Sequence, residues 1–416
     1  MPRRPLLQYC AGPLVLNQVP TISPTIDSVV APDRAAPVLC FVGDSAIRLW
    51  GLTPAERLKR AFARHGITTV VDPMALADAI GPVILLRADA VLDAPLVTAL
   101  ADTAGLLIVG EDGRPIAANV APANAPAVAS GLCAGTITDS ARLGLDAKRP
   151  GDLDAAFWKA LRKRETPYAM IIDEGNRKAV EWRMFMGTYK GATDFVTKHL
   201  WPFPAYVTTR ILAPLGITPN MVTALSAVCV VAAYFKFLAG DWTVGLLAAW
   251  MMTFLDTVDG KLARVTLTSS KWGDVFDHGI DLVHPPFWYS AWAVAVMASP
   301  NPLEPEMFWL CLTTILGGYV LQRIMEGLSI KFFGLEIHIW RRIDTLFRQV
   351  TARRNPNLVI MTLSVIGGRP DWGLLAVAAW TMLCLVLHVV QLAQAFVARR
   401  RHGPLESWMN RHPRQS

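Results

Sequence analysis

Four aspartates in this chain have a spacing that suits divalent-cation chemistry. Asp256 and Asp259 lie three residues apart, and Asp277 and Asp281 lie four apart. On helices these spacings place both members of a pair on one face, so two helices can bring both pairs together across their seam. The surrounding stretches are apolar enough for a membrane, where a carboxylate is costly unless it has a function and a compensating charge. Carboxylate oxygens are preferred ligands of Mg²⁺, and two such ions can clamp the oxygens of a phosphoryl displacement.

Small and basic residues recur beside these aspartates. Gly260 and Ala263 share the helical face of the first pair and leave room for a ligand, and Arg264 offers a planar guanidinium to a phosphate. Gly273 leaves room near the start of the second helix, where anions are favoured. The complete string is Asp256-x-x-Asp259-Gly260-x-x-Ala263-Arg264, eight residues, and then Gly273-x-x-x-Asp277-x-x-x-Asp281.

At every fixed position this string resembles the signature of the CDP-alcohol phosphotransferase family, also called the CDP-alcohol phosphatidyltransferases. The resemblance covers roughly residues 190–400. It implies six transmembrane helices behind an interfacial amphipathic helix, with a polar cavity that faces the cytoplasm. It also implies direct attack of an acceptor hydroxyl on the β-phosphorus of a CDP-linked donor, with release of CMP, in phospholipid or polar-lipid synthesis.

The same resemblance implies a role for each residue of the motif. Asp256, Asp259, Asp277 and Asp281 would hold two Mg²⁺ or Mn²⁺ ions, and Asp281 would also be the general base. The residues that would shape the CDP site are Asp256, Gly260, Ala263, Arg264 and Gly273. Two arginines outside the motif, Arg323 and Arg354, are candidates for contact with a phosphate or with the alcohol or lipid acceptor. Anchoring of the membrane domain by positive charge is the alternative for both. Members of the family are often dimers, although no residue here indicates a homodimer interface.

Composition divides the chain of 416 residues into two parts. Hydrophobic residues make up 53%, and they concentrate in long runs after about residue 217. The formal charge is +7, but the Lys and Arg residues cluster beside the apolar runs. This distribution favours contact with membrane lipids over binding of nucleic acid.

The apolar runs predict a six-span membrane domain over residues 217–400. An amphipathic interfacial segment over 187–216 precedes it, and a basic tail over 401–416 follows it. The predicted spans are 219–238, 244–264, 272–297, 306–327, 358–367 and 374–397, of which the fifth is short for a bilayer. The turns after spans one, three and five are poor in Lys and Arg. Positive-inside bias therefore puts both termini and the carboxylates on the cytoplasmic side of a multi-pass protein, which we expect in a bacterial inner membrane.

Residues 1–186 predict a soluble α/β domain with a largely parallel sheet. We expect strands at 38–42, 67–71, 83–86 and 106–109 and helices at 53–64, 95–103 and 152–163, while 112–139 is unassigned. No apolar run follows the basic N-terminus, so we expect no signal peptide and a cytoplasmic domain. Gly43, Arg48 and the strand-end Asp89 resemble a sugar-phosphate or inositol-phosphate nucleotidyltransferase. The glycine-rich loop is reduced, which indicates a degenerate active site. The alternatives are a domain that still makes a CDP-alcohol and an unrelated small α/β regulatory domain.

Two other functions fit an intramembrane group of carboxylates. A transporter could use them as an ion pathway, and an inactive membrane protein could serve as a scaffold for the front domain. Within the transferase interpretation the donor stays open between CDP-diacylglycerol and a CDP-polyol such as CDP-inositol.

Overall fold

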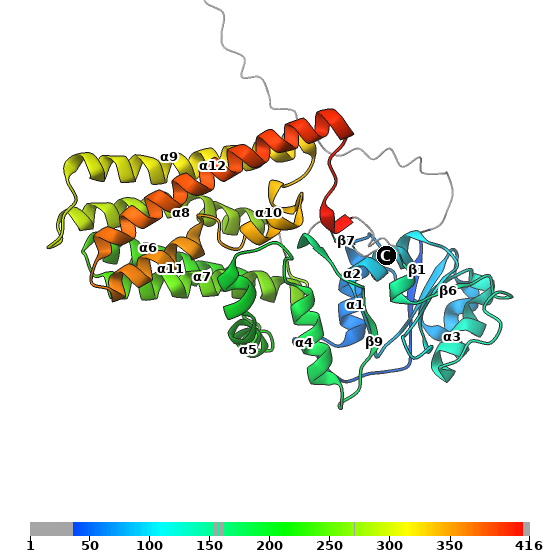
Figure 1. The fold of residues 1–416 in the computed structure, drawn as a ribbon. Helices are drawn as coiled ribbons and strands as arrows, with labels where there is room; N and C mark the ends of the chain where they lie inside the picture. Colours follow the sequence, from blue (N-terminus) through cyan, green and yellow to red (C-terminus); the bar gives the residue numbers. More distant parts are fainter. Residues whose placement is uncertain (1–35, 154–156, 159–160, 270, 411–416) are drawn as a thin grey trace, which may run out of the picture. The chain divides into compact units, whose positions relative to one another are not determined.

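The computed structural model describes residues 36–153, 157–158, 161–269 and 271–410. The first part of this range is an α/β region and the second is a set of long helices (Figure 1). The main elements of the α/β region are β1 (Val38–Val42), α1 (Pro54–Ala63), β2 (Val83–Arg87), β3 (Ala90–Leu92), α2 (Ala94–Asp102), β4 (Leu106–Val109), β5 (Pro115–Val120), α3 (Ala125–Ala134), β6 (Asp146–Lys148), β9 (Ala169–Ile171) and α4 (Arg177–Gly187).

The central sheet has five strands in the order β1-β2-β5-β4-β6. β1 pairs with β2 and β4 pairs with β6 in parallel, whereas β5 is antiparallel to both of its neighbours. The sheet is therefore mixed, and the prediction of a largely parallel sheet is wrong. The antiparallel strand lies in the Ala-, Gly- and Pro-rich segment that the sequence analysis left unassigned.

Alternating side chains of the strands pack against helices on both faces of the sheet. Ile84 and Leu86 join the core that α1 and α2 cover, and Val83 and Leu85 join the core that α3 covers. Thr53 begins α1 with a capping box, in which its hydroxyl accepts from the backbone N–H of Glu56 and the Glu56 carboxylate accepts from the backbone N–H of Thr53.

Two predicted elements of this region differ from the structure. Residues 67–71 contribute only a single bridge, between Leu39 and Val70, because the segment soon leaves β1. The predicted helix at 152–163 overlaps positions that the structure does not describe. Its described residues form a 3₁₀ turn (Pro150–Asp152) and two short strands, β7 (Phe157–Trp158) and β8 (Lys163–Arg164).

The helical part begins with a π-helical turn, η5, and the short helix α5. The elements are η5 (Val196–Leu200), α5 (Pro202–Leu212), α6 (Pro219–Leu238), α7 (Trp242–Val265), α8 (Lys271–Met297), α9 (Pro305–Phe333), η6 (Ile337–Ile339), α10 (Arg342–Phe347), α11 (Arg354–Ile366) and α12 (Pro370–His402). All six predicted apolar segments are thus helices, and the fifth begins at Arg354.

Within the described residues, three helices are long and apolar enough to cross a membrane, namely α6, α9 and α12. The prediction of six spans is confirmed to that extent. The other three helices do not meet this description, because α7 and α8 carry the charged motif and α11 has only 13 residues. The chain is therefore a membrane protein with an α/β region before its helices.

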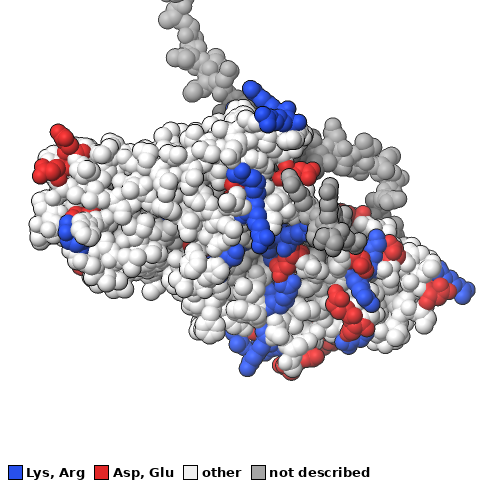
Figure 2. Space-filling view, in the orientation of Figure 1, with Lys and Arg blue, Asp and Glu red and all other residues white. Residues whose placement is uncertain are grey.

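Apolar side chains on these helices face outward, as expected for contact with lipid. Val228 and Phe235 on α6 are 63% and 60% exposed. The surface of the long helices is nearly free of charge along its length, and charged side chains gather toward its ends (Figure 2). α9 and α12 run side by side (Figure 1), and a side chain at Gly318 of α9 would collide with Thr381 of α12. Small residues of this kind allow membrane helices to approach closely.

The described residues from Ala36 onward belong to one compact unit, in which α1 contacts the end of α7. Arg60 of α1 donates to the carbonyl of Thr266 at 3.0 Å, and Arg57 donates to the carbonyl of Val265. These are carbonyls at the C-terminal end of α7, which have no partner within the helix. Burial lowers the pKa of Arg57 to about 10, so the guanidinium stays protonated at neutral pH.

Candidate functional site

The two aspartate pairs lie on neighbouring helices, as the spacing predicted. Asp256 is on α7, and Asp277 and Asp281 are on α8. Their ligand oxygens all lie within 4.8 Å of one another. Three carboxylates this close repel one another strongly unless a cation lies between them. Their convergence is therefore suited to metal binding.

Asp259 is the most deeply buried of the four aspartates and lies outside this close group. Its side chain is 3% exposed, and Oδ2 accepts from the hydroxyl of Thr223 on α6 at 2.6 Å. Among the described residues, its Oδ1 has no hydrogen-bond partner. A buried carboxylate oxygen without a partner is costly, and a bound cation would satisfy it. The donor set of four carboxylates thus fits the predicted hard divalent cations.

Arg354 lies against the carboxylates, at the first turn of α11. Its guanidinium donates to Oδ2 of Asp256 at 2.6 Å and also to Oδ1 of Asp281. One planar guanidinium can bind two acceptors in this way because its donors have a fixed fork geometry. Arg354 therefore supplies part of the charge compensation that the aspartates need. The prediction was contact with an acceptor or phosphate, and the structure joins Arg354 to the motif itself.

A cavity of about 370 Å³ lies beside the motif. Seven predicted site residues line it, namely Asp256, Gly260, Arg264, Asp277, Asp281, Arg323 and Arg354. The described lining does not include three others, which are Asp259, Ala263 and Gly273. Gly260 matters sterically, since a Cβ there would lie 3.3 Å from Nη1 of Arg264.

Cations outnumber carboxylates around this cavity. The lining has eight Lys or Arg side chains: Arg162, Lys190, Lys261, Arg264, Arg323, Arg348, Arg353 and Arg354. It has four carboxylates: Asp194, Asp256, Asp277 and Asp281. Eight positive minus four negative charges leaves a formal excess of four, and this excess favours anionic ligands.

Several of these cations are buried without full compensation. Arg348 is 9% exposed, and among the described residues its Nε and Nη1 have no hydrogen-bond partner. Burial, together with the nearby charge of Arg353, lowers the pKa of Arg348 to about 9. Burial and the neighbouring Arg162 and Arg264 also lower the pKa of Lys190. An anion in the cavity would relieve both penalties.

Sequence reasoning missed most of these cations as members of one site. Lys190 lies outside the motif and Lys261 stands at one of its variable positions. Arg348 and Arg353 are among the Lys and Arg residues beside the apolar runs, which were attributed to contact with membrane lipids. One signal was available, because the doublet Arg353-Arg354 stands just before an apolar segment. Paired arginines at the start of a helix can point to different sides of it.

Comparison with known proteins matches the helical part of the chain. Residues 216–348 match the model of the family "CDP-alcohol phosphatidyltransferase". The phosphatidylinositol phosphate synthase of Streptomyces avermitilis is 34% identical over 95 residues, which cover 23% of this chain and 37% of that protein. The archaetidylinositol phosphate synthase of Pyrococcus horikoshii is 40% identical over 73 residues, covering 17% and 38%. Cholinephosphotransferase 1 of Bos taurus is 27% identical over 179 residues, covering 41% and 38%.

These matches share two features. Each spans less than two fifths of the relative's length, at 37%, 38% and 38%. Two of the three relatives are named as inositol phosphate synthases, of the phosphatidyl and the archaetidyl kind, and the third is named as a cholinephosphotransferase.

Proposed function

This chain belongs to the CDP-alcohol phosphatidyltransferase family, and from that premise we propose that it is a membrane-bound CDP-alcohol phosphotransferase. It transfers a substituted phosphate group from a CDP-linked donor to the hydroxyl of an acceptor, and CMP leaves. The observation that carries this proposal is the convergence of Asp256, Asp277 and Asp281 within 4.8 Å beside a cationic cavity.

Asp281 is the general base in this mechanism. Its carboxylate takes the proton of the acceptor hydroxyl as the hydroxyl oxygen attacks the β-phosphorus of the donor. The new P–O bond forms as the bond between that phosphorus and the CMP oxygen breaks. Asp256, Asp259, Asp277 and Asp281 would hold two Mg²⁺ or Mn²⁺ ions, which when bound neutralise charge on the phosphates. The orphaned Oδ1 of Asp259 supports this ligand set.

Gly260 and Arg264 belong to the donor side of the cavity. Gly260 leaves space beside the guanidinium of Arg264, which can bind a phosphate of CDP with two parallel hydrogen bonds. Ala263 and Gly273 would also shape the CDP site, as the resemblance of the motif implies. Arg354, held by Asp256 and Asp281, lies where the transferred phosphate would gather negative charge.

The acceptor carries an anionic group of its own. The CDP diphosphate accounts for part of the cationic lining. Three arginines remain, which come from α9, the end of α10 and the start of α11, namely Arg323, Arg348 and Arg353. A phosphate on the acceptor matches these three guanidiniums. Either a phosphate-bearing polyol or an anionic lipid provides that group, with CDP-diacylglycerol as the donor in the first case and a CDP-polyol in the second.

The proposed topology has six membrane-crossing helices, α6, α7, α8, α9, α11 and α12, with both termini and the cavity on the cytoplasmic side. α7 and α8 have 24 and 27 residues, enough to cross a bilayer, with their carboxylates turned toward each other. α11 has 13 residues and crosses only where irregular structure completes it.

The front domain is a degenerate nucleotidyltransferase in this proposal. Asp89 is the carboxylate that would be needed for a metal, and Arg87 binds it with two hydrogen bonds of 3.0 and 2.8 Å. A third bond joins Arg87 to the carbonyl of Leu132 at 2.8 Å, so the pair also links β2 to α3. Arg87 binds both oxygens of Asp89, which leaves neither of them free for a metal. Asp256 and Asp281 differ, because Arg354 binds only one oxygen of each.

CMP release by detergent-purified protein tests the proposal. CDP-diacylglycerol and CDP-inositol are each supplied with Mg²⁺, together with inositol, glycerol, their phosphate esters or a membrane lipid extract. We expect release that requires both the metal and an acceptor, and that is faster with phosphate-bearing acceptors. Folded protein that binds no CDP would contradict the proposal and favour the transporter or the scaffold.

A further inference from the structure

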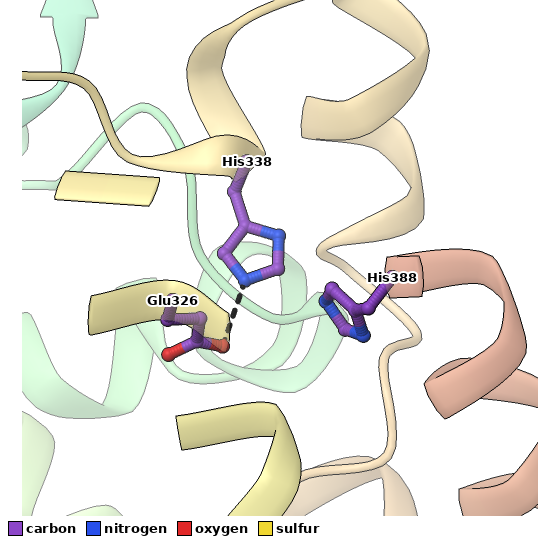
Figure 3. A group of neighbouring side chains, drawn as sticks. All are labelled: Glu326, His338 and His388. Atoms are coloured by element: carbon purple, nitrogen blue, oxygen red, sulfur yellow. Dashed lines mark hydrogen bonds and ion pairs between the residues drawn. The ribbon is translucent and has the colours of Figure 1, made fainter. Parts of the chain in front are cut away.

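A second group of metal-ligating side chains lies next to the cavity. Glu326 of α9, His338 of η6 and His388 of α12 have ligand atoms within 4.8 Å of one another (Figure 3). His338 and His388 are 2% and 1% exposed. Two imidazoles and one carboxylate form a common donor set for zinc, so this group needs a physical explanation.

Charge argues against a metal ion at this group. Oε1 of Glu326 accepts from Nη2 of Arg323 at 2.9 Å and also from Nη2 of Arg353. Nε2 of His338 is a third partner of the same oxygen at 3.0 Å, and the dashed line in Figure 3 marks this bond. The lone pairs of that oxygen are therefore occupied, and a divalent cation would face two guanidiniums in a buried site.

His338 and His388 pack beside the carboxylate of Glu326. Burial lowers the pKa of His338 to about 3, so its ring is neutral at pH 7 and leaves the charge of Glu326 to the arginines. Nδ1 of His388 donates to the carbonyl of Cys384 at 2.8 Å. The rings of His338 and His388 lie edge to face, with 5.3 Å between their centroids, and this contact packs the group against α12.

The partners of Glu326 face the cavity, whereas Glu326 does not belong to its described lining. Arg323 and Arg353 both line the cavity. An arginine side chain has about 2 kcal/mol of rotamer entropy, part of which is lost when it binds a ligand. A carboxylate behind two arginines removes most of that loss in advance, because it holds both before the ligand arrives.

We propose that Glu326 is a positioning residue that holds Arg323 and Arg353 as a preformed pair for the anionic group of the acceptor. This inference rests on the proposed function and adds to it the residue that organises the acceptor side. Glu326 itself touches neither substrate.

Glu326→Gln tests the inference in the full-length protein. A neutral amide cannot hold two guanidiniums as a carboxylate does. We expect the KM for a phosphate-bearing acceptor to rise roughly tenfold or more, which corresponds to about 1.4 kcal/mol. The KM for the CDP donor should change less than about twofold. Glu306→Gln is the matched control, because Glu306 is an exposed glutamate in the first turn of the same helix and should leave both constants unchanged.

A conservative variant and a coupling measurement separate positioning from a general structural role. Glu326→Asp keeps the charge on a shorter side chain. It should raise the acceptor KM by a smaller factor and leave the donor KM nearly unchanged, and it provides the test if Glu326→Gln fails to fold. Arg353→Lys should raise the acceptor KM as well, and the double variant Glu326→Gln/Arg353→Lys should add little. A uniform fall in kcat with unchanged acceptor KM, in variants that are active, overturns the inference.

Binding of inorganic phosphate distinguishes failure of the inference from failure of the proposed function. Isothermal titration in detergent should show weaker phosphate binding by Glu326→Gln than by wild type, even if no tested donor releases CMP. Equal phosphate affinity in both proteins contradicts the inference and leaves the transferase standing. A first-row transition metal that copurifies with wild type and is lost in His388→Ala would instead make the group a metal site.

Discussion

At the residue scale, charge compensation governs this site. Asp256, Asp277 and Asp281 are drawn together on two helices. The buried Asp259, outside that group, keeps an oxygen without a partner among the described residues. Arg354 compensates Asp256 and Asp281. The negative charge that Arg354 leaves uncompensated is the physical reason to expect metal ions, since isolated carboxylates in an apolar environment are strongly disfavoured.

Asp281→Asn should abolish turnover and leave binding of the CDP donor largely intact. The amide cannot accept the hydroxyl proton, and loss of a general base typically costs about 10²–10⁴-fold in rate. Asp256→Asn should weaken donor and metal binding as well. CMP release and titration with CDP measure the two effects.

Asp241→Asn is the matched control for both aspartate variants. Asp241 caps the far end of α7 and pairs with Lys236 at 3.0 Å, and asparagine caps a helix equally well. A turnover rate of Asp281→Asn equal to that of wild type would contradict the role of Asp281 as the general base.

Gly260→Ala should raise the KM for the donor several-fold with little effect on the acceptor. The new Cβ would come to 3.3 Å from Nη1 of Arg264 and displace its guanidinium. Gly317→Ala on α9 is the control, because no neighbour lies within 4 Å of a Cβ there. Steady-state kinetics with each substrate varied in turn measures the donor KM and the acceptor KM separately. A donor KM equal to that of wild type would contradict the proposed position of Arg264.

At the element scale, the motif helix α7 is held at its C-terminal end by α1. Arg57 and Arg60 bind the last carbonyls of α7, where a positive charge also favours the helix dipole. Two side chains from the α/β region therefore hold the C-terminal end of α7.

The double variant Arg57→Ala/Arg60→Ala should lower both the thermal stability and kcat, the latter by several-fold. Removing two charge-assisted hydrogen bonds at a helix end costs about 1 kcal/mol or more. Arg64→Ala, at the exposed C-cap of α1, is the control. Thermal unfolding in detergent and CMP release are the measurements, and unchanged values for both would mean that these contacts do not support α7.

Helices and the motif could be predicted from sequence because their determinants are local. Runs of apolar residues predicted the positions of all six helices, and the spacing of the aspartates predicted that Asp256, Asp277 and Asp281 converge. β5 was missed because Ala, Gly and Pro carry little strand signal. The cationic side of the cavity was missed as a unit because Arg323 and Arg353 reach it from segments far from the motif, through tertiary packing that no local pattern encodes.

At the scale of the whole molecule, an α/β region precedes the long helices within one compact unit. Under the proposed function the front domain, whose Asp89 is paired with Arg87, has a structural role. Its contact with the end of α7 gives that structural role a physical basis.

Cys133 offers a test of membrane orientation. It is an exposed thiol on α3 in the α/β region, while Cys40, Cys311 and Cys384 are buried. With Cys10 replaced by serine, a membrane-impermeant maleimide should label inside-out vesicles and leave right-side-out vesicles unlabelled. Cys133→Ser should lose the label. Labelling of right-side-out vesicles would reverse the proposed topology.

Two successive residues at the start of α11 serve different clusters, since Arg353 binds Glu326 and Arg354 binds Asp256 and Asp281. Arg353 is the extended N-cap residue and Arg354 is the first helical residue, so the two side chains leave the backbone in different directions. Deleting one residue upstream would therefore leave one of the two clusters without its arginine, because Ala352 and Asn355 flank the pair. Apart from Arg348 and Arg353, the loop between α10 and α11 should consequently tolerate substitutions far better than insertions or deletions. Among natural variants, its length should be more uniform than that of the loops at the other end of the helices.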